Sequence, residues 1–296
     1  MENVKLSPAQ KFWKTVKSNP IVVLLVVIGI IVGFTKDNFF SWRNFGNLAS
    51  NTAVRFLIAL GVSGCLITKG TDLSAGRQVG FAACLAGVLL QRANYAGRLF
   101  PNMPEMNMGV VLLIVLAIGA VFGLLNGLII AFLNVPPFIA TLGTMFCARG
   151  VAYLANGNRN TDAIVTGLGK EAGDAFQNFF YYGKTLGIYN AFWIAFVIFA
   201  VVFFLMNKTR TGRHIYAIGS NVDAAKLSGI NVFATTTKAY LISAFCAAIV
   251  GLILAGQAGM GNMEAGNSYE MYGVAAGVIG GISPLGGSGL LLGAFA

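Results

Sequence analysis

Polar side chains that can do chemistry stand in apolar surroundings at a few points of the sequence. Asp72 and Ser74 lie in a short turn between two apolar stretches, and Gly70 and Gly76 flank them. Glycine permits irregular backbone, and irregular backbone in a membrane is tolerated where it faces protein or a water-filled cavity. Three roles remain open for Asp72: it caps the following helix, it pairs with Arg77, or it contacts a solute directly.

Two more polar residues interrupt apolar runs. Asn126 lies beside Gly119, Gly123 and Gly127, which recur every fourth residue and therefore share one helix face. Such a ridge of glycines permits close approach of another helix, so the Asn126 amide either bonds a neighbouring helix or reaches a polar pathway. Arg149 either faces a cavity or a partner, because a cation is costly in lipid, or it extends its head to the membrane surface.

Enzymatic chemistry finds no support in the residues. No nucleophile–base pair and no cluster of metal ligands stands out, and the single histidine, His214, lies in a basic loop. The four cysteines stand in apolar stretches without C-x-x-C spacing, which indicates buried, inert thiols. A G-x-x-x-x-G-K-[ST] phosphate loop is also missing from the sequence. We therefore predict no catalytic residue, no metal and no cofactor.

The composition indicates that the elements carrying these residues lie in a membrane. The chain has 296 residues, of which 56% are hydrophobic and 10% charged, and its mean hydropathy is +0.75. Soluble domains carry about 25% charged residues. Because the apolar runs are continuous rather than alternating, they favour helices over a β-barrel. The net charge of +10 fits basic cytoplasmic loops, so we predict contact with membrane lipid and no nucleic-acid partner.

The predicted fold is all-α, a polytopic transmembrane bundle with about eight or more spans. Several of the predicted spans are shorter than about 20 residues, so some of them are candidates for broken or re-entrant helices. The chain is treated as one transmembrane domain, residues 1–296, and its short apolar end leads us to expect at least one further span. The predicted spans are Pro20–Phe34, Val54–Thr68, Val79–Leu90, Gly109–Leu133, Phe138–Ala155, Ala191–Met206, Ala239–Ala255 and Tyr272–Ile282.

Positive charge predicts the orientation. The N-terminal tail and the loop Asn207–Lys238 are each rich in lysine or arginine, so both are expected in the cytoplasm. Six crossings separate them, which returns the chain to its starting side. The segment Asn156–Asn190 has balanced charges and is expected outside.

A short helix is predicted within the basic loop. Asn221 or Ser220 can cap its start, Asp223 suits the helix dipole, and Gly229 is placed to end it. With about two turns it is too short to be stable alone in water. It either packs on its own bundle or docks into a partner. The residues proposed for docking are Asn221, Asp223, Ala224, Ala225, Lys226 and Gly229.

Four segments, in order, resemble permease subunits of bacterial ATP-binding-cassette sugar importers of the ribose, xylose and galactose group. The first segment, Lys69–Gly80, resembles the G-x-D-L-S-x-G turn of this family. The third segment, Gly212–Val232, resembles the part of these permeases that couples to the ATPase. The likeness covers nearly the whole chain, and T-D-L-S-A-G-R-Q-V-G is most like members that carry galactose and methyl galactosides. The segments are KGTDLSAGRQVG at Lys69–Gly80, GLLNGLIIAFLNVPPFIATLGTM at Gly123–Met145, GRHIYAIGSNVDAAKLSGINV at Gly212–Val232 and AAGVIGGISPLGGSG at Ala275–Gly289.

The resemblance implies a mechanism and partners. Two copies of the permease form the channel in the cell inner membrane, a separate cytoplasmic ATPase drives it, and an extracytoplasmic binding protein delivers the sugar. Asp72, Ser74, Asn126 and Arg149 are the candidate pathway residues. The alternative is a stand-alone, ion-coupled secondary sugar transporter, which needs an ion site within the membrane. Carboxylates are scarce within the spans, since Asp72 and Glu270 lie at span edges.

Overall fold

The computed structural model describes residues 20–161 and 164–289. The basic N-terminal tail and the apolar end Leu290–Ala296 therefore lie outside the described residues. The chain divides into two compact units, residues 1–48 and 49–296. The first holds helix α2, Pro20–Thr35, the turn that follows it, and the first residues of helix α3, Trp42–Ile67.

The second unit begins within α3 and contains the remaining elements. Strands β1 and β2 form an antiparallel hairpin in which Lys184 pairs with Tyr189. The elements are α4 Ala75–Leu89, α5 Met108–Ala131, α6 Pro137–Ala155, α7 Ile164–Leu168, α8 Lys170–Gln177, the π-helix η1 Asn178–Tyr182, β1 Lys184–Thr185, β2 Ile188–Tyr189, α9 Asn190–Lys208, α10 Arg210–Ser220, α11 Val222–Leu227, α12 Val232–Ala258 and α13 Tyr269–Ile279.

The predicted all-α fold is confirmed, and each of the eight predicted spans contains a helix. Within the described residues α3, α5, α6, α9 and α12 are long and apolar enough to cross a membrane. α2, α4 and α13 are shorter, with 16, 15 and 11 residues. The break between α5 and α6 falls at the predicted place, because Pro137 is the first residue of α6 and its ring has no N–H to donate.

Two predicted loops contain more structure than expected. The loop Asn207–Lys238 was predicted to hold one short helix, but it also contains the last residues of α9, all of α10 and the start of α12, which includes Lys238. The segment Asn156–Asn190 contains α7, α8, η1 and the hairpin. In α10 the buried side chains of Ile215 and Ile218 explain the helix, because they anchor a face that local propensity alone does not favour.

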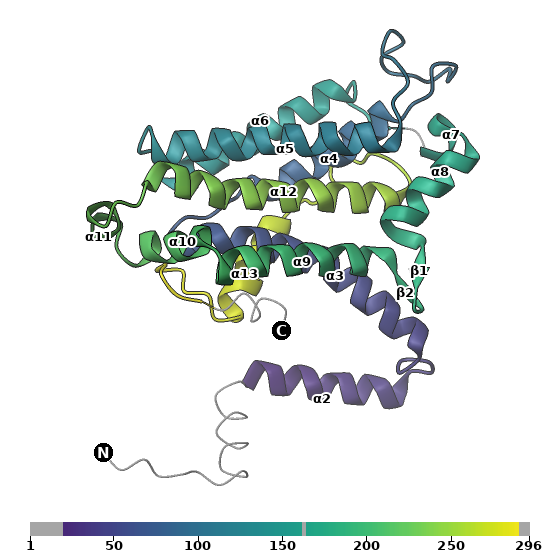
Figure 1. Ribbon diagram of the computed structural model, residues 1–296. Helices are drawn as coiled ribbons and strands as arrows, with labels where there is room; N and C mark the ends of the chain where they lie inside the picture. The colour runs from purple at the N-terminus through teal and green to yellow at the C-terminus, as the bar shows by residue number, and fades with distance from the viewer. Residues whose placement is uncertain (1–19, 162–163, 290–296) are drawn as a thin grey trace. The chain divides into compact units, whose positions relative to one another are not determined.

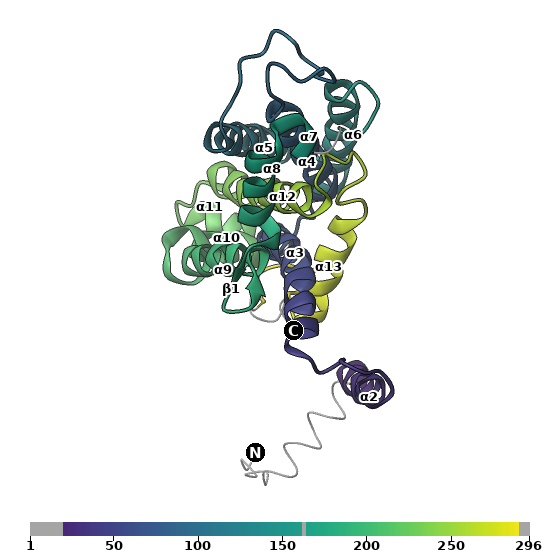
Figure 2. The same ribbon diagram turned by 90° about the vertical axis from the view of Figure 1, so that its right-hand side faces the viewer.

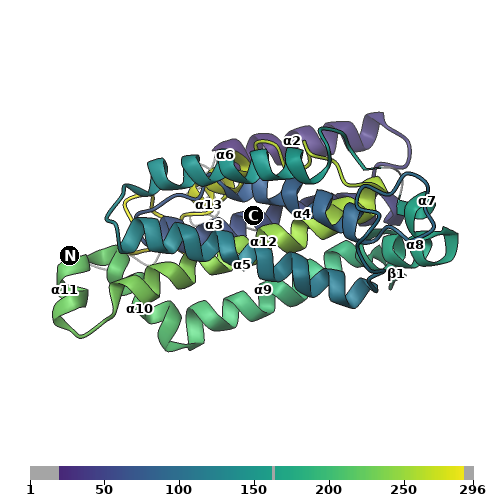
Figure 3. The ribbon, with the colours of Figure 1, turned by 90° about the horizontal axis from the view of Figure 1, so that it is seen from above.

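Helix α12 forms the centre of the second unit. Figure 1 shows it running between α5 and α9, Figure 2 shows it near the centre when viewed from the end, and Figure 3 shows it from above, partly behind α5. In its most apolar window 78% of the residues are buried, against 28% for α5 and 22% for α9. α5 and α9 therefore expose apolar faces suited to lipid, while α12 packs against protein on nearly all sides.

The glycine ridge of α5 packs closely on another helix, as predicted, and the structure identifies that helix as α12. A Cβ at Gly127 would lie 2.6 Å from the Thr237 Cα atom, and one at Gly123 would lie 2.9 Å from the Leu241 Cα atom. Real Cβ atoms do not approach backbone that closely, so the two helices depend on the absence of side chains here. The ridge also carries Asn126 at the level of the turn between α3 and α4.

Gly127→Ala is expected to lower the free energy of unfolding by about 1–3 kcal/mol, because the added methyl must separate α5 from α12. The matched control is Gly143→Ala in α6, where an added Cβ meets no atom within 4 Å. Since alanine favours helix over glycine by up to about 1 kcal/mol, the control should be neutral or slightly stabilising. Thermal unfolding of the purified protein in detergent measures both, and equal midpoints would contradict the packing argument.

Candidate functional site

The turn between α3 and α4 holds Asp72 in a fully buried position. The Ser74 backbone N–H donates to Asp72 Oδ1 at 3.0 Å, and the Ser243 hydroxyl of α12 donates to Asp72 Oδ2 at 2.6 Å. The Ser74 hydroxyl also donates to Oδ1. Asp72 thus fastens the turn to the central helix. The alternative of a pair with Arg77 is wrong, because that arginine binds Glu264 at 2.8 Å instead.

The hydrogen bonds continue from Ser74 to α5 and α6. The Ser74 hydroxyl accepts from Asn126 Nδ2 at 2.9 Å and from Gln78 Nε2 at 2.7 Å. Asn126 Oδ1 in turn accepts from the Thr144 hydroxyl at 2.6 Å. Asn126 therefore takes the first of its two predicted roles, a bond to neighbouring elements. We call Asp72, Ser74, Asn126, Thr144 and Ser243 the buried polar network.

The buried polar network joins three predicted residues to two that the sequence analysis missed. Thr144 and Ser243 are small polar residues in otherwise apolar helices, and that contrast was the signal available for finding them. Each of the five side chains is at most 6% exposed. Because Asp72 already accepts three hydrogen bonds and faces no solvent, this arrangement is suited to holding helices together rather than to binding a solute.

Arg149 belongs to a separate group of charged residues, the Glu264 cluster, made of Arg77, Arg149, Tyr153, Glu264 and Asn267. Glu264 lies in the connection between α12 and α13, and its Oε2 atom accepts from Arg77 Nη1 at 2.8 Å. Its Oε1 atom accepts from the Tyr153 hydroxyl at 3.0 Å and lies 3.5 Å from Arg149 Nη2. Arg77 Nη2 donates to Asn267 Oδ1 at 2.9 Å.

Arg149 has a partner in Glu264, in agreement with the first of the two alternatives for this residue. The guanidinium also lies over the Tyr153 ring, 5.6 Å from its centroid. The sequence analysis missed Glu264 and Asn267 because both stand outside the apolar runs. The structure therefore divides the four candidate pathway residues, with Asp72, Ser74 and Asn126 in the buried polar network and Arg149 in this cluster.

The short helix α11 has the predicted boundaries. Asn221 Oδ1 accepts from the backbone N–H groups of Asp223 and Ala224, at 2.9 and 3.0 Å, which is the pattern of an N-cap. Gly229 follows with φ of +77°, a conformation that side chains with a Cβ resist. Asn221, rather than Ser220, is thus the cap, and Gly229 terminates the helix as expected.

The exposed face of α11 differs from the one expected. Ala225 is only 4% exposed and faces its own chain, so it supports the helix from within and offers no docking contact in this conformation. Leu227 is 91% exposed instead, and the Asp223 side chain is 90% exposed. Lys226 lies 3.8 Å from Asp223 on the solvated side. Leu227 was not among the predicted docking residues, although its place outside every apolar run was the available signal.

A cavity of about 370 Å³ separates α11 from the turn between α3 and α4. Val222 and Lys226 line it from α11, and Thr68 and Gly70 line it from the turn. Tyr240 of α12 also borders it and donates from its hydroxyl to the Thr71 carbonyl at 3.3 Å. A displacement of α11 into this space would therefore reach the backbone next to Asp72.

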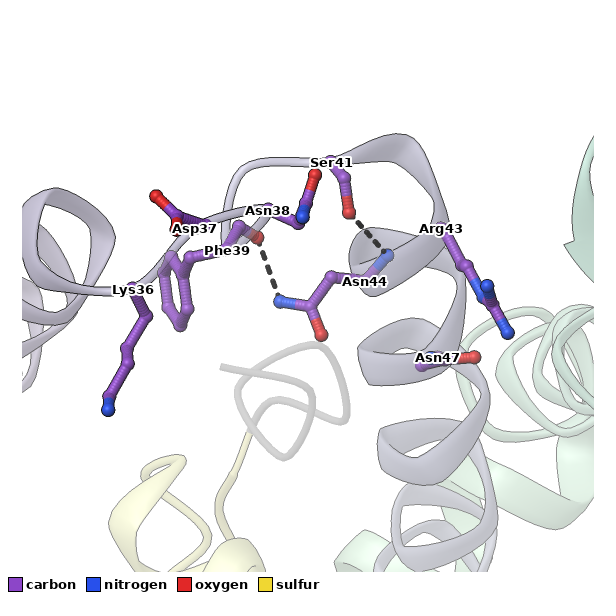
Figure 4. A pocket seen from close by; sticks show the side chains of 8 residues that line it. All are labelled: Lys36, Asp37, Asn38, Phe39, Ser41, Arg43, Asn44 and Asn47. Carbon is purple, nitrogen blue, oxygen red and sulfur yellow. Dashed lines mark hydrogen bonds between the residues drawn. The ribbon is translucent and has the colours of Figure 1, made fainter.

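A second cavity, of about 320 Å³, lies within the first unit at the turn between α2 and α3. Apart from Phe39 it is lined by polar side chains, and Figure 4 shows Lys36 and Arg43 pointing to opposite sides of it. Asn44 closes the turn, since its Nδ2 atom donates to the Phe39 carbonyl at 2.8 Å and its backbone N–H donates to the Ser41 hydroxyl. Its cations do not converge, so this cavity lacks the geometry of a binding site.

Comparison with known proteins covers nearly the whole chain. The family model for the permease component of the branched-chain amino acid transport system matches residues 44–295. The galactose/methyl galactoside import permease protein MglC of Escherichia coli is 44% identical over 272 residues, which make up 92% of this chain and 80% of that protein. The protein of the same name from Haemophilus influenzae is 42% identical over 288 residues, 96% of this chain and 84% of that protein.

Permeases with other named substrates are less similar. The ribose import permease protein RbsC of Haemophilus influenzae is 34% identical over 271 residues, which are 92% of this chain and 79% of that protein. No solved structure shows a significant match to the chain.

Proposed function

Because the chain belongs to the family of branched-chain amino acid transport system permease components, we propose that it is the membrane-spanning subunit of an ATP-binding-cassette importer for galactose or methyl galactosides. The sugar assignment rests on a difference in sequence identity. The chain is 44% identical to an MglC protein over 272 residues but 34% identical to an RbsC protein over 271 residues. The α-helical fold, with its apolar helices, suits a subunit that crosses the inner membrane several times.

The proposal includes three protein partners. A cytoplasmic ATPase binds α11, whose exposed leucine and well-capped ends suit docking. An extracytoplasmic sugar-binding protein delivers the substrate, and a second copy of the chain completes the channel. The N-terminus lies in the cytoplasm on this proposal, in agreement with the excess of lysine and arginine in the N-terminal tail and around α10.

The proposed mechanism connects α11 to the buried polar network. ATP binding and release by the partner move α11 relative to the bundle, and the 370 Å³ cavity gives that motion room. The motion reaches the turn that Asp72 anchors on α12, and it biases the bundle between an inward-open and an outward-open state. The permease itself performs no hydrolysis.

The rival function is ion-coupled transport by the chain alone. It requires a coupling-ion site within the membrane, usually built from carboxylates or from the carbonyl groups of broken helices. Asp72 is buried and hydrogen-bonded, and Glu264 is paired with arginine, so neither of these two carboxylates has the setting that a coupling-ion site needs. Glu270, in the first turn of α13, has a buried Oε2 atom without a hydrogen-bond partner among the described residues, so it is the carboxylate that the rival function would have to use.

Reconstitution in liposomes tests the proposed function. With the ATPase, the binding protein and ATP, galactose should accumulate against its gradient, whereas the chain alone should accumulate none in a proton or sodium gradient. An ATPase that binds ATP but cannot hydrolyse it is the control. Competition with methyl galactoside and with ribose then reports the substrate class, and ion-driven accumulation by the chain alone would overturn the proposal in favour of its rival.

A further inference from the structure

The Glu264 cluster lies at the depth of a membrane span. Arg149 stands six residues before the end of α6, about 9 Å along the helix at 1.5 Å per residue. α6 is one of the helices long and apolar enough to cross a membrane. Thr144, five residues earlier in α6, bonds the buried polar network. The cluster therefore lies only about one to two turns from the centre of the bundle.

Residues 259–268, which carry Glu264 and Asn267, return along α4 without forming a helix. A Cβ at Gly87 would lie 3.0 Å from the Gly261 nitrogen, and one at Gly80 would lie 2.7 Å from the Met263 carbonyl oxygen. The segment thus passes back along about two turns of α4, and Figure 2 shows it between α6 and α13. Non-helical backbone at this depth is tolerated only where it is buried in protein or lines a water-filled cavity.

The charges of the Glu264 cluster are not buried. The side chains of Arg149 and Glu264 are 44% and 46% exposed, although Arg77 is only 12% exposed. Charged groups at this depth are costly in lipid and are found facing water or other protein. The exposed residues of α6 on the far side of the helix, such as Cys147 and Leu154, are apolar or weakly polar and suit lipid. The position of Arg149 on α6, by contrast, requires water or protein beside it.

We propose that the Glu264 cluster is a sugar-contacting wall of the translocation passage, an inference that rests on the function proposed above. A guanidinium has five donors and a carboxylate about four acceptor sites, more than the contacts of Arg149 and Glu264 occupy among the described residues. Sugar hydroxyls both donate and accept, so they match such a pair. Two cations against one carboxylate disfavour a metal cation as the ligand.

Transport by the complete importer tests the contact. Glu264→Gln and Arg149→Gln should each reduce galactose uptake at least tenfold, while ATP hydrolysis stimulated by the loaded binding protein stays within about twofold, so that fewer sugars cross per ATP. Lys184→Gln, which removes an exposed charge from the β1–β2 hairpin, is the control and should change neither quantity. Parallel loss of uptake, hydrolysis and thermal stability would show that the cluster only fastens residues 259–268 and would overturn the proposal.

Thiol labelling tests whether the face is wet. Met145 stands one turn before Arg149 on the same side of α6, whereas Cys147 is two residues, or about 200°, away from either. Met145→Cys, combined with Cys147→Ser, should react with a charged, membrane-impermeant methanethiosulfonate, and galactose delivered by the binding protein should slow the reaction. Cys147 in the unaltered chain is exposed, unlike the other three cysteines, so the prediction of four buried thiols is wrong for this residue. It should nevertheless remain unreactive in lipid.

The labelling outcomes are separable from the proposed function. A cysteine at position 145 that never reacts in an importer that still transports galactose would place the cluster in a dry interface and overturn the proposal. Equal reaction at Cys147 would remove the distinction between the two faces of α6 and also overturn it. If the proposed function is wrong, the reconstituted importer made of unaltered proteins will show no ATP-driven galactose uptake, before any variant is tested.

Discussion

Asp72→Ala is expected to destabilise the protein by several kcal/mol and to abolish transport through loss of folded protein. The change leaves the Ser74 N–H and the hydroxyls of Ser74 and Ser243 without their acceptor inside the bundle. A buried donor without a partner costs about 1–3 kcal/mol, and each of these is buried. Size-exclusion chromatography after stepwise heating in detergent measures the loss as a lower midpoint.

Asp72→Asn is the matched control for that experiment. Asparagine keeps the shape of the side chain and one carbonyl oxygen for Ser74, and the Ser243 hydroxyl can accept from its amide. The loss of stability should therefore be clearly smaller than for alanine. An Asp72→Ala protein with an unchanged midpoint but no transport would contradict the structural role and favour the direct solute contact that the sequence left open.

Long apolar runs were the most predictable part of the fold. The predicted span Gly109–Leu133 differs from α5 by one residue at its start and two at its end, because lipid-facing apolar residues and flanking polar residues both mark the limits. Close packing of the glycine face of α5 was also predictable, because small residues at every fourth position permit it, but the identity of its partner α12 was not. By contrast, α10 was missed, because its helix depends on burying Ile215 and Ile218 rather than on local propensity.

The candidate site was predictable only in its parts. The sequence singled out Asp72, but its partner Ser243 is 171 residues away, and no local pattern connects the two. Glu264 lies in a polar connection between two helices, where a carboxylate is common and predicts no site. Only the fold shows that Arg77 and Arg149 form ion pairs with it. Spacing likewise predicted α11 and its ends but not which side it presents, since that depends on how α10 and α12 support it.

The exposed side of α11 is expected to control assembly with the cytoplasmic ATPase. Leu227→Asp is expected to lower the affinity for the cytoplasmic ATPase at least tenfold, because a leucine that is 91% exposed outside the apolar helices is suited to burial in a partner. Desolvating an unpaired carboxylate in its place opposes docking. The substitution should leave the bundle intact, since the Leu227 side chain makes little contact with its own chain.

Leu186→Asp is the matched control, because Leu186 is 79% exposed and lies between β1 and β2, on the segment expected outside the membrane. Co-purification of the ATPase with the permease measures docking, and sugar-stimulated ATP hydrolysis measures coupling. We expect both to fall for Leu227→Asp and neither to change for Leu186→Asp, with equal thermal midpoints for the two proteins. Docking of the ATPase through α11 requires the exposed Leu227 side chain to be covered by the partner. If the Leu227→Asp protein assembles normally and its ATP hydrolysis still responds to sugar, α11 is therefore only a connector, and the ATPase must bind elsewhere on the cytoplasmic side.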